Sequence, residues 1–361
     1  MERLNVVFTG GGTGGHLYPA IAIAQALGER ANVTFIGTAD RLEAKIVPAA
    51  GYPLVTVRAA PFKRAYVNIA GIAQALSALR RLNPDIVIAT GGYVCFPVVV
   101  AARMLRKTVA LLEPNAHPGL TNRALAPLVN EVWGAFPHGD SRFAGKYVYT
   151  GVPVRASLRA LPQREAALER LGLSAQRRTL LAMGGSQGAR SINDALTSLL
   201  KTGGLPEGWQ LIHVTGEQEY DRVKAALRQA QRDSSSEGAL RAYLNDVADA
   251  YAAADLVLAR AGASTLGELA ATGRPAILVP YPHAAGDHQR ANAAMRAQAG
   301  AAVVVDDREL VAGKLRGILG ETTRPARLAE LRAAAERERP ADPITTILAR
   351  VDALTARKKP A

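Results

Sequence analysis

Short runs of Val, Ile and Leu alternate along the chain with longer segments in which apolar residues recur at helical spacing. Segments 18–29 and 68–82 show this spacing, with apolar positions three and four residues apart. The short runs are apolar at nearly every position, which is typical of parallel strands buried on both faces. We expect strands at 5–9, 33–37, 54–57, 86–90, 109–112 and 131–133, and then at 179–183, 211–215, 240–244, 256–259, 276–280 and 302–305. This order predicts an α/β protein with parallel sheets covered by helices.

The alternation of strands and helices repeats in the second half of the chain, which predicts two domains. A length of 361 residues is sufficient for two hydrophobic cores. Pro153 and Pro162 interrupt the periodicity, so we place the boundary within residues 150–163. We therefore expect a first domain over 1–155, a second over 156–335, and a C-terminal segment over 336–361.

The C-terminal segment is predicted to contain one helix. Asp342 followed by Pro343 is a typical helix start, with an acidic cap before proline in the first turn. The apolar residues of this helix share one face, and they are Ile344, Ile347, Leu348, Val351 and Leu354. Because such a face needs a partner surface, we expect the helix to pack on the first domain, with 357–361 as a frayed tail.

The charge of the chain limits its possible partners, and its cysteine content indicates the compartment. The formal net charge of +13 favours anionic lipid surfaces, phosphorylated substrates or nucleic acid. Aromatic residues make up only 5% of the chain and are not interleaved with the basic residues, so we expect no nucleic-acid partner. Cys95 is the single cysteine, which excludes an internal disulfide and suits a reducing cytosol.

No segment is predicted to cross a membrane. The apolar run 94–102 is well short of the roughly 20 residues that a spanning helix needs. No signal peptide is expected, because residues 4–9 already have the pattern of a buried strand.

Contact with a membrane surface is a separate hypothesis. An apolar stripe on the helix predicted at 68–82 lies near basic residues; the stripe is Ile69, Ile72, Leu76 and Leu79, and the basic residues are Lys63, Arg64, Arg80 and Arg81. The stripe is either ordinary core or an interfacial patch that binds anionic lipid.

Three glycine-rich loops follow predicted strands, two in the first half and one in the second. They are Gly10-Gly-Gly-Thr-Gly-Gly-His16, Thr90-Gly-Gly-Tyr93 and Gly184-Gly-Ser-Gln-Gly-Ala189. Glycine lets backbone amides approach a ligand at a helix N-terminus, and Ser186 adds a hydroxyl donor for a diphosphate. A tight turn without a ligand explains one such loop, but three at strand ends indicate a site. In open α/β sheets ligands bind beyond the carboxyl ends of strands, and two such sheets facing each other would form one cleft.

The first loop also fits the dinucleotide fingerprint through Gly10, Gly12 and Gly15. That fingerprint requires an acidic residue at the end of the second strand, where this chain has Gly37 and Thr38. A nicotinamide-dependent oxidoreductase is therefore disfavoured.

Two polar motifs in the second half have alternative explanations. Glu268 lies after a turn at 262–265, where a carboxylate either closes a capping box with Thr265 or accepts hydrogen bonds from a ribose diol. His283, Asp287 and His288 lie on a loop broken by proline and glycine, without a cysteine. We favour contacts with sugar hydroxyls over a metal site there.

Taken together, these motifs resemble the MurG family, the peptidoglycan N-acetylglucosaminyltransferases that convert lipid I to lipid II. The matching segments run in family order over nearly the whole chain, and they are 11–16, 90–93, 113–122, 150–155, 184–188, 262–268 and 283–292. The resemblance implies a GT-B fold, in which two doubly wound Rossmann-like domains face each other across a cleft. It also implies an inverting, metal-independent reaction, in which the muramyl 4-hydroxyl attacks C1 of UDP-GlcNAc and UDP leaves.

The resemblance assigns donor-binding roles in the second domain. The loop with Ser186, Gln187 and Gly188 is expected to hold the diphosphate, and Glu268 the ribose diol. The uracil edge would be met by backbone at Tyr243 and Leu244. Further positions are expected to line the nucleotide-sugar pocket or face the sugar, and they are Ala263, Ser264, Thr265, Gln289 and Asn292.

In the first domain the resemblance points to both substrates. Thr13 and Asn115 match positions on the acceptor side in the family. Together with Gly14, Gly15 and Arg155, they are also expected to contact the donor. Gly91, Gly92 and Tyr93 are expected on the acceptor side. Three positions depart from the usual family pattern, namely Pro114, Val152 and His288; the change at 152 puts in doubt any hydrogen bond from that loop.

The acceptor hydroxyl needs a general base. His16 is our first candidate, because a histidine beside a glycine loop can titrate near neutral pH; the alternative is that it only hydrogen-bonds the loop. Glu113 is the second candidate.

The expected partners are UDP-GlcNAc, lipid I, an anionic membrane surface and other cell-wall synthesis proteins, at the cytoplasmic face of the cell membrane. No cofactor or metal is expected. The alternatives are a glycolipid synthase with the same cleft, a UDP-GlcNAc 2-epimerase on this fold, or a binding module for RNA or anionic lipid.

Overall fold

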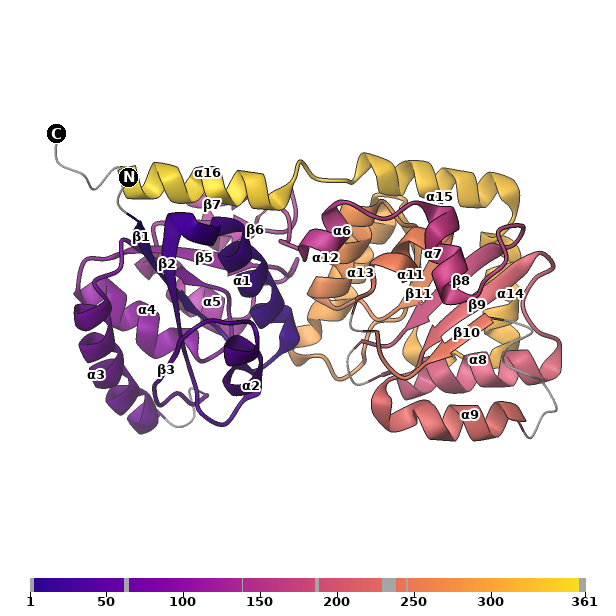
Figure 1. The fold of residues 1–361 in the computed structure, drawn as a ribbon, viewed down its shortest axis with the longest axis horizontal. Helices are drawn as coiled ribbons and strands as arrows, with labels where there is room; N and C mark the ends of the chain where they lie inside the picture. Colours follow the sequence, from indigo (N-terminus) through magenta and orange to yellow (C-terminus); the bar gives the residue numbers. More distant parts are fainter. Residues whose placement is uncertain are drawn as a thin grey trace. The chain divides into compact units, whose positions relative to one another are not determined.

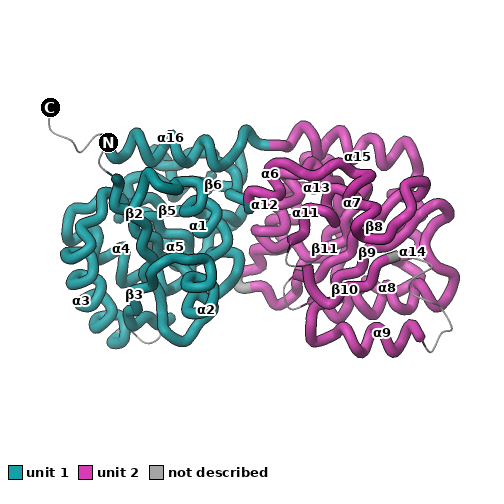
Figure 2. Tube along the Cα trace, viewed as in Figure 1, with its two compact units in different colours: residues 1–155, 340–361 teal, residues 156–339 magenta. Residues whose placement is uncertain are grey.

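The chain folds into two compact units in a computed structural model that describes residues 3–61, 65–137, 139–185, 188–228, 238–244 and 246–356. The first unit contains Met1–Arg155 and Pro340–Ala361, and the second contains Ala156–Arg339 (Figure 2). Each unit is an α/β domain with a parallel sheet, as the alternating pattern predicts (Figure 1).

The first unit contains a seven-stranded sheet in the order β3-β2-β1-β4-β5-β6-β7. Its strands are β1 (Leu4–Thr9), β2 (Ala31–Gly37), β3 (Leu54–Thr56), β4 (Ile86–Ala89), β5 (Thr108–Glu113), β6 (Glu131–Gly134) and β7 (Tyr147–Tyr149). Its helices are α1 (Gly14–Leu27), α2 (Leu42–Ala49), α3 (Ala65–Leu82), α4 (Cys95–Met104), α5 (Leu120–Leu125) and α16 (Pro343–Ala356), with short 3-10 helices η1 (Gly28–Arg30), η3 (Ala126–Leu128) and η4 (Ser141–Phe143).

The second unit contains a six-stranded sheet in the order β10-β9-β8-β11-β12-β13. Its strands are β8 (Arg178–Met183), β9 (Trp209–Val214), β10 (Gly238–Arg241), β11 (Leu256–Ala259), β12 (Ala276–Leu278) and β13 (Ala302–Val304). Its helices are α6 (Ala156–Arg159), α7 (Arg164–Leu171), α8 (Arg190–Thr202), α9 (Tyr220–Arg228), α11 (Ala248–Ala253), α12 (Ala263–Thr272), α13 (His288–Gln298), α14 (Ala312–Thr322) and α15 (Pro325–Arg337), with 3-10 helices η5 (Glu217–Glu219), η6 (Ala285–Asp287) and η7 (Asp307–Glu309).

The predicted strands all correspond to strands of the structure, with differences at their ends. The strand predicted at 240–244 ends at Arg241, so Leu244 lies beyond β10. The sequence pattern missed β7, because three residues, Tyr147, Val148 and Tyr149, are too short a run to show a period. Helix α1 begins at Gly14 rather than at residue 18, so the first glycine loop supplies its first turn.

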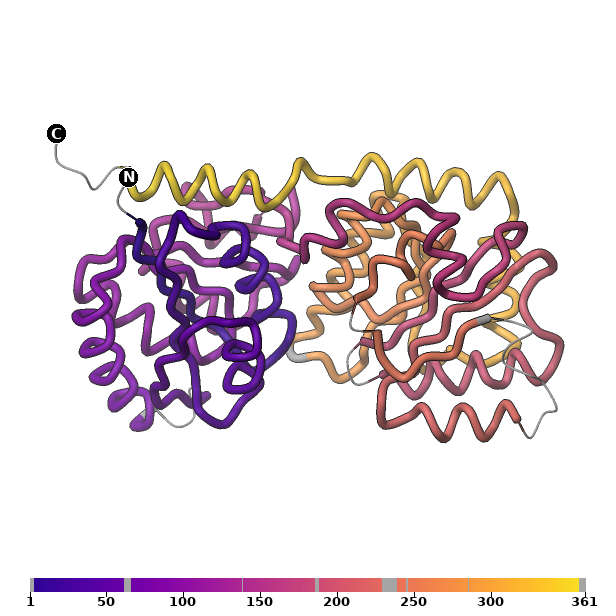
Figure 3. Tube along the Cα trace, in the orientation of Figure 1, coloured from indigo at the N-terminus to yellow at the C-terminus, as the bar shows by residue number. Residues whose placement is uncertain are grey.

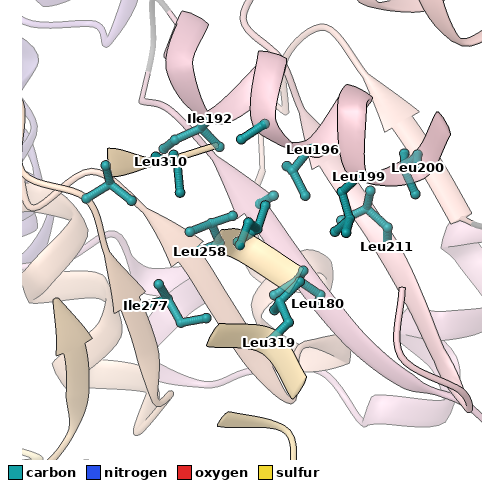
Figure 4. Close-up of a cluster of buried hydrophobic side chains, with 14 of the residues drawn as sticks. Leu180, Ile192, Leu196, Leu199, Leu200, Leu211, Leu258, Ile277, Leu310 and Leu319 are labelled. Atoms are coloured by element: carbon teal, nitrogen blue, oxygen red, sulfur yellow. The ribbon is translucent and has the colours of Figure 1, made fainter. Parts of the chain in front are cut away.

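Helices cover both faces of each sheet. In the first unit one face packs on α1 and α16, and the other packs on α3 and α4. In the second unit leucines of α8 point toward the sheet, where Leu196 and Leu199 join Leu180, Leu211 and Leu258 in one buried cluster (Figure 4). Both faces of each sheet are covered by helices. A ligand site is therefore expected beyond the carboxyl ends of the strands.

The last helix returns to the first unit. It begins as predicted, since the Asp342 carboxylate accepts hydrogen bonds from the Thr345 amide at 3.2 Å and the Thr345 hydroxyl at 2.6 Å. Its apolar face lies in the same core as α1, and Figure 3 shows the yellow C-terminal helix beside the indigo N-terminal segment. Arg350 pairs with the buried Glu131, which also accepts a hydrogen bond from Trp133 Nε1 at 3.0 Å. Within the described ranges, no helix has the length and apolar character needed to span a membrane.

Candidate functional site

The glycine loops lie where the strand order of each sheet reverses. The chain winds outward from β1 toward β3 and then crosses to β4, so β1 and β4 are neighbours whose following loops diverge. The same holds for β8 and β11 in the second unit. Ligands of doubly wound sheets bind at such switch points. The sequence located the loops, and the sheet order explains why the two loops of the first unit are neighbours.

His16 is fixed against the second loop of the first unit. Its Nδ1 lies 2.8 Å from the carbonyl oxygen of Thr90. A carbonyl only accepts, so in the neutral ring Nδ1 carries the proton and Nε2 is the nitrogen able to accept one. Gly91 makes this approach possible: it has φ +105°, and a Cβ there would lie 2.6 Å from His16 Nδ1. The arrangement leaves His16 half-buried with a defined basic nitrogen.

Glu43 holds the first glycine loop, and the sequence analysis missed it. Its carboxylate is 1% exposed and accepts hydrogen bonds from the Gly12 amide at 3.1 Å and the Thr38 hydroxyl at 2.6 Å. The side chain passes directly under Gly11, where a Cβ would lie 2.5 Å from the carboxylate. The sequence lacks an acidic residue at the end of β2, and the carboxylate comes instead from α2. It serves the loop rather than a ribose.

Glu113 is buried at the end of β5, with both carboxylate oxygens occupied. One oxygen accepts from the amide and side chain of Asn115, at 3.0 and 3.1 Å. The other accepts from the Gly119 amide at 3.1 Å and from Asn122 Nδ2 at 2.8 Å. Burial raises the pKa of Glu113, and these hydrogen bonds act in the opposite direction. This geometry suits holding the loop 114–122 in place more than taking a proton from a substrate.

The remaining predicted residues of the first unit lie on the same edge of its sheet. Thr13 is exposed as the N-cap of α1, and Gly14 and Gly15 form that helix's first turn. Arg155 lies over the ring of Tyr18 at 5.5 Å from its centroid, which holds the guanidinium near the start of α1. Gly91, Gly92 and Tyr93 form the turn between β4 and α4; Val152 is buried.

In the second unit the glycine loop between β8 and α8 packs tightly on the end of β9. Gly188 has φ +78°, and a Cβ there would lie 2.1 Å from the carbonyl oxygen of Thr215. No other residue fits that position without moving the backbone. Ser186 and Gln187, predicted to bind the diphosphate, lie outside the described residues.

The turn after β11 differs from the capping box considered above. Gly262 is the N-cap of α12, so Ala263, Ser264 and Thr265 form the first turn and Glu268 lies in the second. The capping box is therefore wrong, because Thr265 is inside the helix rather than at its cap. Ser264 Oγ is shielded from solvent and has no hydrogen-bond partner among the described residues.

Glu268 is oriented by a tyrosine that the sequence analysis did not identify. The hydroxyl of the buried Tyr251, on α11, donates a hydrogen bond to Glu268 Oε2 at 3.0 Å. The carboxylate is half-buried at the carboxyl-end edge of the sheet, so a substrate diol could reach it. The pair joins α11 to α12, and no spacing in the sequence indicates it.

Arg260 connects the elements that surround this edge. It pairs with Asp307, donates to Ser191 Oγ at 3.0 Å and to the Val279 carbonyl at 3.2 Å, and lies over Tyr281. Ser191 belongs to the first turn of α8, directly after the glycine loop. The guanidinium therefore fixes that helix relative to the loop 280–287.

The other predicted donor residues differ in accessibility. Gln289 is half-buried, and its side-chain oxygen accepts from the Tyr281 amide at 2.9 Å. Asn292 is fully buried and donates to the Ala261 carbonyl at 3.2 Å, which ties α13 to the turn before α12. Leu244 is half-buried on the segment after β10. In the described part of the chain, no group of three or more His, Cys, Asp or Glu side chains is placed to hold a metal ion.

The apolar stripe on α3 separates into two parts. Ile72 and Leu76 pack against the core, and Leu79 is fully buried in it. Tyr66 and Ile69, near the start of the helix, are 72% and 70% exposed. The core interpretation thus holds for three of the four stripe residues; Lys63 and Arg64 lie outside the described residues.

Comparison with known proteins assigns both halves of the chain to one family. Residues 6–133 match the glycosyltransferase family 28 N-terminal domain, and residues 179–345 match its C-terminal domain. A protein of Moorella thermoacetica named UDP-N-acetylglucosamine--N-acetylmuramyl-(pentapeptide) pyrophosphoryl-undecaprenol N-acetylglucosamine transferase is 43% identical over 337 residues, which cover 89% of this chain and 91% of that protein. A protein of the same name from Desulforudis audaxviator is 39% identical over 350 residues, which cover 92% and 94%.

Solved structures agree on the fold. The crystal structure of Acinetobacter baumannii MurG matches with a TM-score of 0.79 and 28% identity, covering 96% of this chain and 99% of that one. A putative UDP-N-acetylglucosamine 2-epimerase from Listeria monocytogenes matches with a TM-score of 0.68 at 12% identity, covering 99% and 98%. At that identity the likeness extends to the fold alone.

Proposed function

This chain belongs to glycosyltransferase family 28, and from that premise we propose that it transfers N-acetylglucosamine from UDP-GlcNAc to N-acetylmuramyl-(pentapeptide) pyrophosphoryl-undecaprenol. The observation that carries the proposal is the identity of about 40%, over nearly the whole chain, with proteins named for this activity. Glycine loops at the switch points of both sheets give the same reaction a physical basis, because a sugar nucleotide needs a diphosphate site and the acceptor needs a base.

The reaction is a single displacement with inversion. The 4-hydroxyl of the muramyl sugar attacks C1 of the donor, the bond from C1 to the diphosphate oxygen breaks, and UDP leaves with the bonding electrons. The hydroxyl proton goes to His16 Nε2, since Nδ1 is committed to the Thr90 carbonyl. Glu113 instead positions the loop that carries Asn115, because four hydrogen bonds already occupy its oxygens.

The main catalytic task of the donor site is to stabilise the negative charge on the departing diphosphate. We expect the loop 184–188 and the N-terminus of α8 to supply backbone amides to it, with Ser186 and Gln187 as further donors and Arg155 as a cation. No metal is required in this scheme, because these donors take the place of a cation at the diphosphate.

The nucleoside and sugar are held by residues around α12 and α13. Glu268 accepts hydrogen bonds from the ribose diol, and Tyr251 fixes its orientation. Ser264 Oγ, which has no hydrogen-bond partner among the described residues, donates to the nucleotide sugar. Ala263 and Thr265 line the same pocket. Gln289 turns its amide to the sugar, whereas the buried Asn292 acts by positioning the turn at Ala261. Backbone at Leu244 contacts the uracil.

The acceptor is a lipid, so the first unit must meet a membrane surface. We assign the turn 91–93 to the acceptor side, and Thr13, Gly14 and Gly15 to contacts with the donor. We place the protein peripherally at the cytoplasmic face of the cell membrane, held by the exposed Tyr66 and Ile69 and by attraction of its net positive charge to anionic lipid. Contacts with other cell-wall synthesis proteins would form at the same surface.

The decisive experiment measures UDP release from UDP-GlcNAc with and without a lipid I analogue, in the presence of EDTA. We expect release that depends on the acceptor and survives the chelator. A 2-epimerase would instead convert the donor without acceptor, and a binding module would release no UDP. Release that stops in EDTA and returns with a divalent cation would overturn the metal-independent scheme.

A further inference from the structure

Tyr281, on the loop that follows β12, holds the side chain of Gln289 through its own backbone. The Tyr281 amide donates a hydrogen bond to Gln289 Oε1 at 2.9 Å, and Gln289 is in the first turn of α13. We propose that Tyr281 is a positioning residue of the donor site, whose amide holds Gln289 so that this side chain meets the donor sugar as a hydrogen-bond donor. The inference rests on the proposed function, in which Gln289 faces that sugar.

The hydrogen bond decides which end of the Gln289 side chain is presented to a ligand. A backbone N–H only donates, so the atom 2.9 Å from it is the oxygen, and Nε2 lies on the other branch of the side-chain amide. An NH2 group only donates, so the ligand must supply an oxygen, which the hydroxyls and the acetamido carbonyl of the sugar do. Without the contact to Tyr281 the side-chain amide is able to turn over and present its oxygen instead. The bond therefore sets the polarity of Gln289 before the donor arrives.

The ring of Tyr281 fixes the backbone that carries this amide. Arg260 lies over the ring at 5.5 Å from its centroid, and His283 approaches it edge-on with the ring centroids 5.6 Å apart. The Arg260 guanidinium is itself anchored, since it pairs with Asp307 and donates to Ser191 Oγ at 3.0 Å. Tyr281 is 42% exposed, so burial in a core does not hold it. These ring contacts hold the loop in register with α13.

Substitutions at position 281 separate the ring from the amide. Tyr281→Phe keeps both, Tyr281→Ala keeps only the N–H, and Tyr281→Pro removes the ring and the N–H. Proline suits this position, because a residue before Pro282 is confined to the extended region, which includes the φ of proline. Tyr220→Ala is the matched control, since Lys224 lies over the Tyr220 ring at 5.3 Å from its centroid, on α9, which packs on α8.

The experiment measures the affinity of the full chain for UDP-GlcNAc and for UDP by calorimetry, without acceptor. Tyr281→Pro should bind UDP-GlcNAc about tenfold more weakly than the wild type, the effect of one misdirected hydrogen bond, and Tyr281→Ala about threefold more weakly. Tyr281→Phe and Tyr220→Ala should bind both ligands as the wild type does. Affinity for UDP should stay unchanged in every variant, because UDP lacks the sugar. A merely structural defect would weaken both ligands alike, and that result would overturn the proposal.

A double substitution tests whether Tyr281 acts through Gln289. Gln289→Met removes the side-chain amide, so adding Tyr281→Pro to it should cause no further loss of UDP-GlcNAc affinity. Additive losses would overturn the proposal, as would equal UDP-GlcNAc affinities of the wild type and Tyr281→Pro. Should Tyr281→Pro fail to fold, Tyr281→Ala takes its place in both comparisons. A wild type that binds neither ligand would instead overturn the proposed function, and this inference with it.

Discussion

His16 and Glu43 are each held by a few well-defined hydrogen bonds. His16 has one nitrogen committed to Thr90, and Glu43 holds the loop beside it from below. The first residue acts on the substrate in our scheme, while the second acts through the loop. The two roles are therefore tested by different substitutions.

Replacing His16 by Ala tests the proposed base. We expect turnover to fall by about 10² to 10⁴-fold, the usual contribution of a positioned base, and the acidic limb of the pH profile of kcat/KM to disappear. UDP affinity should stay unchanged, since the loop that we propose for the diphosphate is in the second unit. A variant that keeps most of its turnover would end this assignment.

Replacing Glu43 by Gln tests the loop support. The amide cannot accept from both Gly12 and Thr38 as the carboxylate does, so we expect kcat/KM to fall by about tenfold to a hundredfold, in line with a buried hydrogen bond left unmade. Asp40→Asn is the control, because that exposed carboxylate lies in the same segment. If both variants kept wild-type kinetics, Glu43 would have no positioning role.

At the scale of elements, the glycine loop of the second unit depends on how α8 packs on β9. His213, buried on β9, donates from Nε2 to Asn193 Oδ1 on α8 at 2.9 Å, and Asn193 Nδ2 donates to the Thr215 carbonyl at 3.0 Å. That same carbonyl is the one against which Gly188 packs. The register between helix and strand thus sets the shape of the loop.

This contact predicts a pH dependence of stability. Burial lowers the pKa of His213 to about 4. Since its pKa in the unfolded chain is about 6.5, only the unfolded state binds the proton between these values, and the stabilisation present above pH 6.5 is lost as the pH falls toward 4. Between pH 7 and pH 4.5 the wild type should lose about 2 kcal/mol more unfolding free energy than His213→Gln. Urea unfolding at the two pH values checks this; parallel losses would contradict it.

At the scale of the whole molecule, function is divided between two sheets. In our proposal the first unit carries the base, the acceptor side and the residues that meet the membrane, and the second carries the residues that bind the nucleotide. The chain passes from the first unit to the second after Arg155 and returns at Pro340, so α16 completes the core of the unit in which the chain began.

The sequence by itself determined the fold class and the location of the glycine loops at strand ends. Periodicity identifies buried parallel strands because both faces of such strands must be apolar, and glycine marks the turns where amides approach a ligand. The start of α16 was also predictable, because its cap is formed by Asp342 and Thr345, which are only three residues apart. These features depend on neighbours in the chain, which a sequence displays directly.

Only the tertiary structure decided which distant side chains meet. Glu43 under Gly11, Tyr251 against Glu268 and Arg260 over Tyr281 come together through sheet order and helix packing, which no spacing encodes. The stripe on α3 is similar: its periodicity was visible, but packing on α4 and the sheet decided that Leu79 is core and Ile69 is exposed. Burial, hydrogen-bond partners and charge clusters are properties of the assembled layers, and so they appear only with the fold.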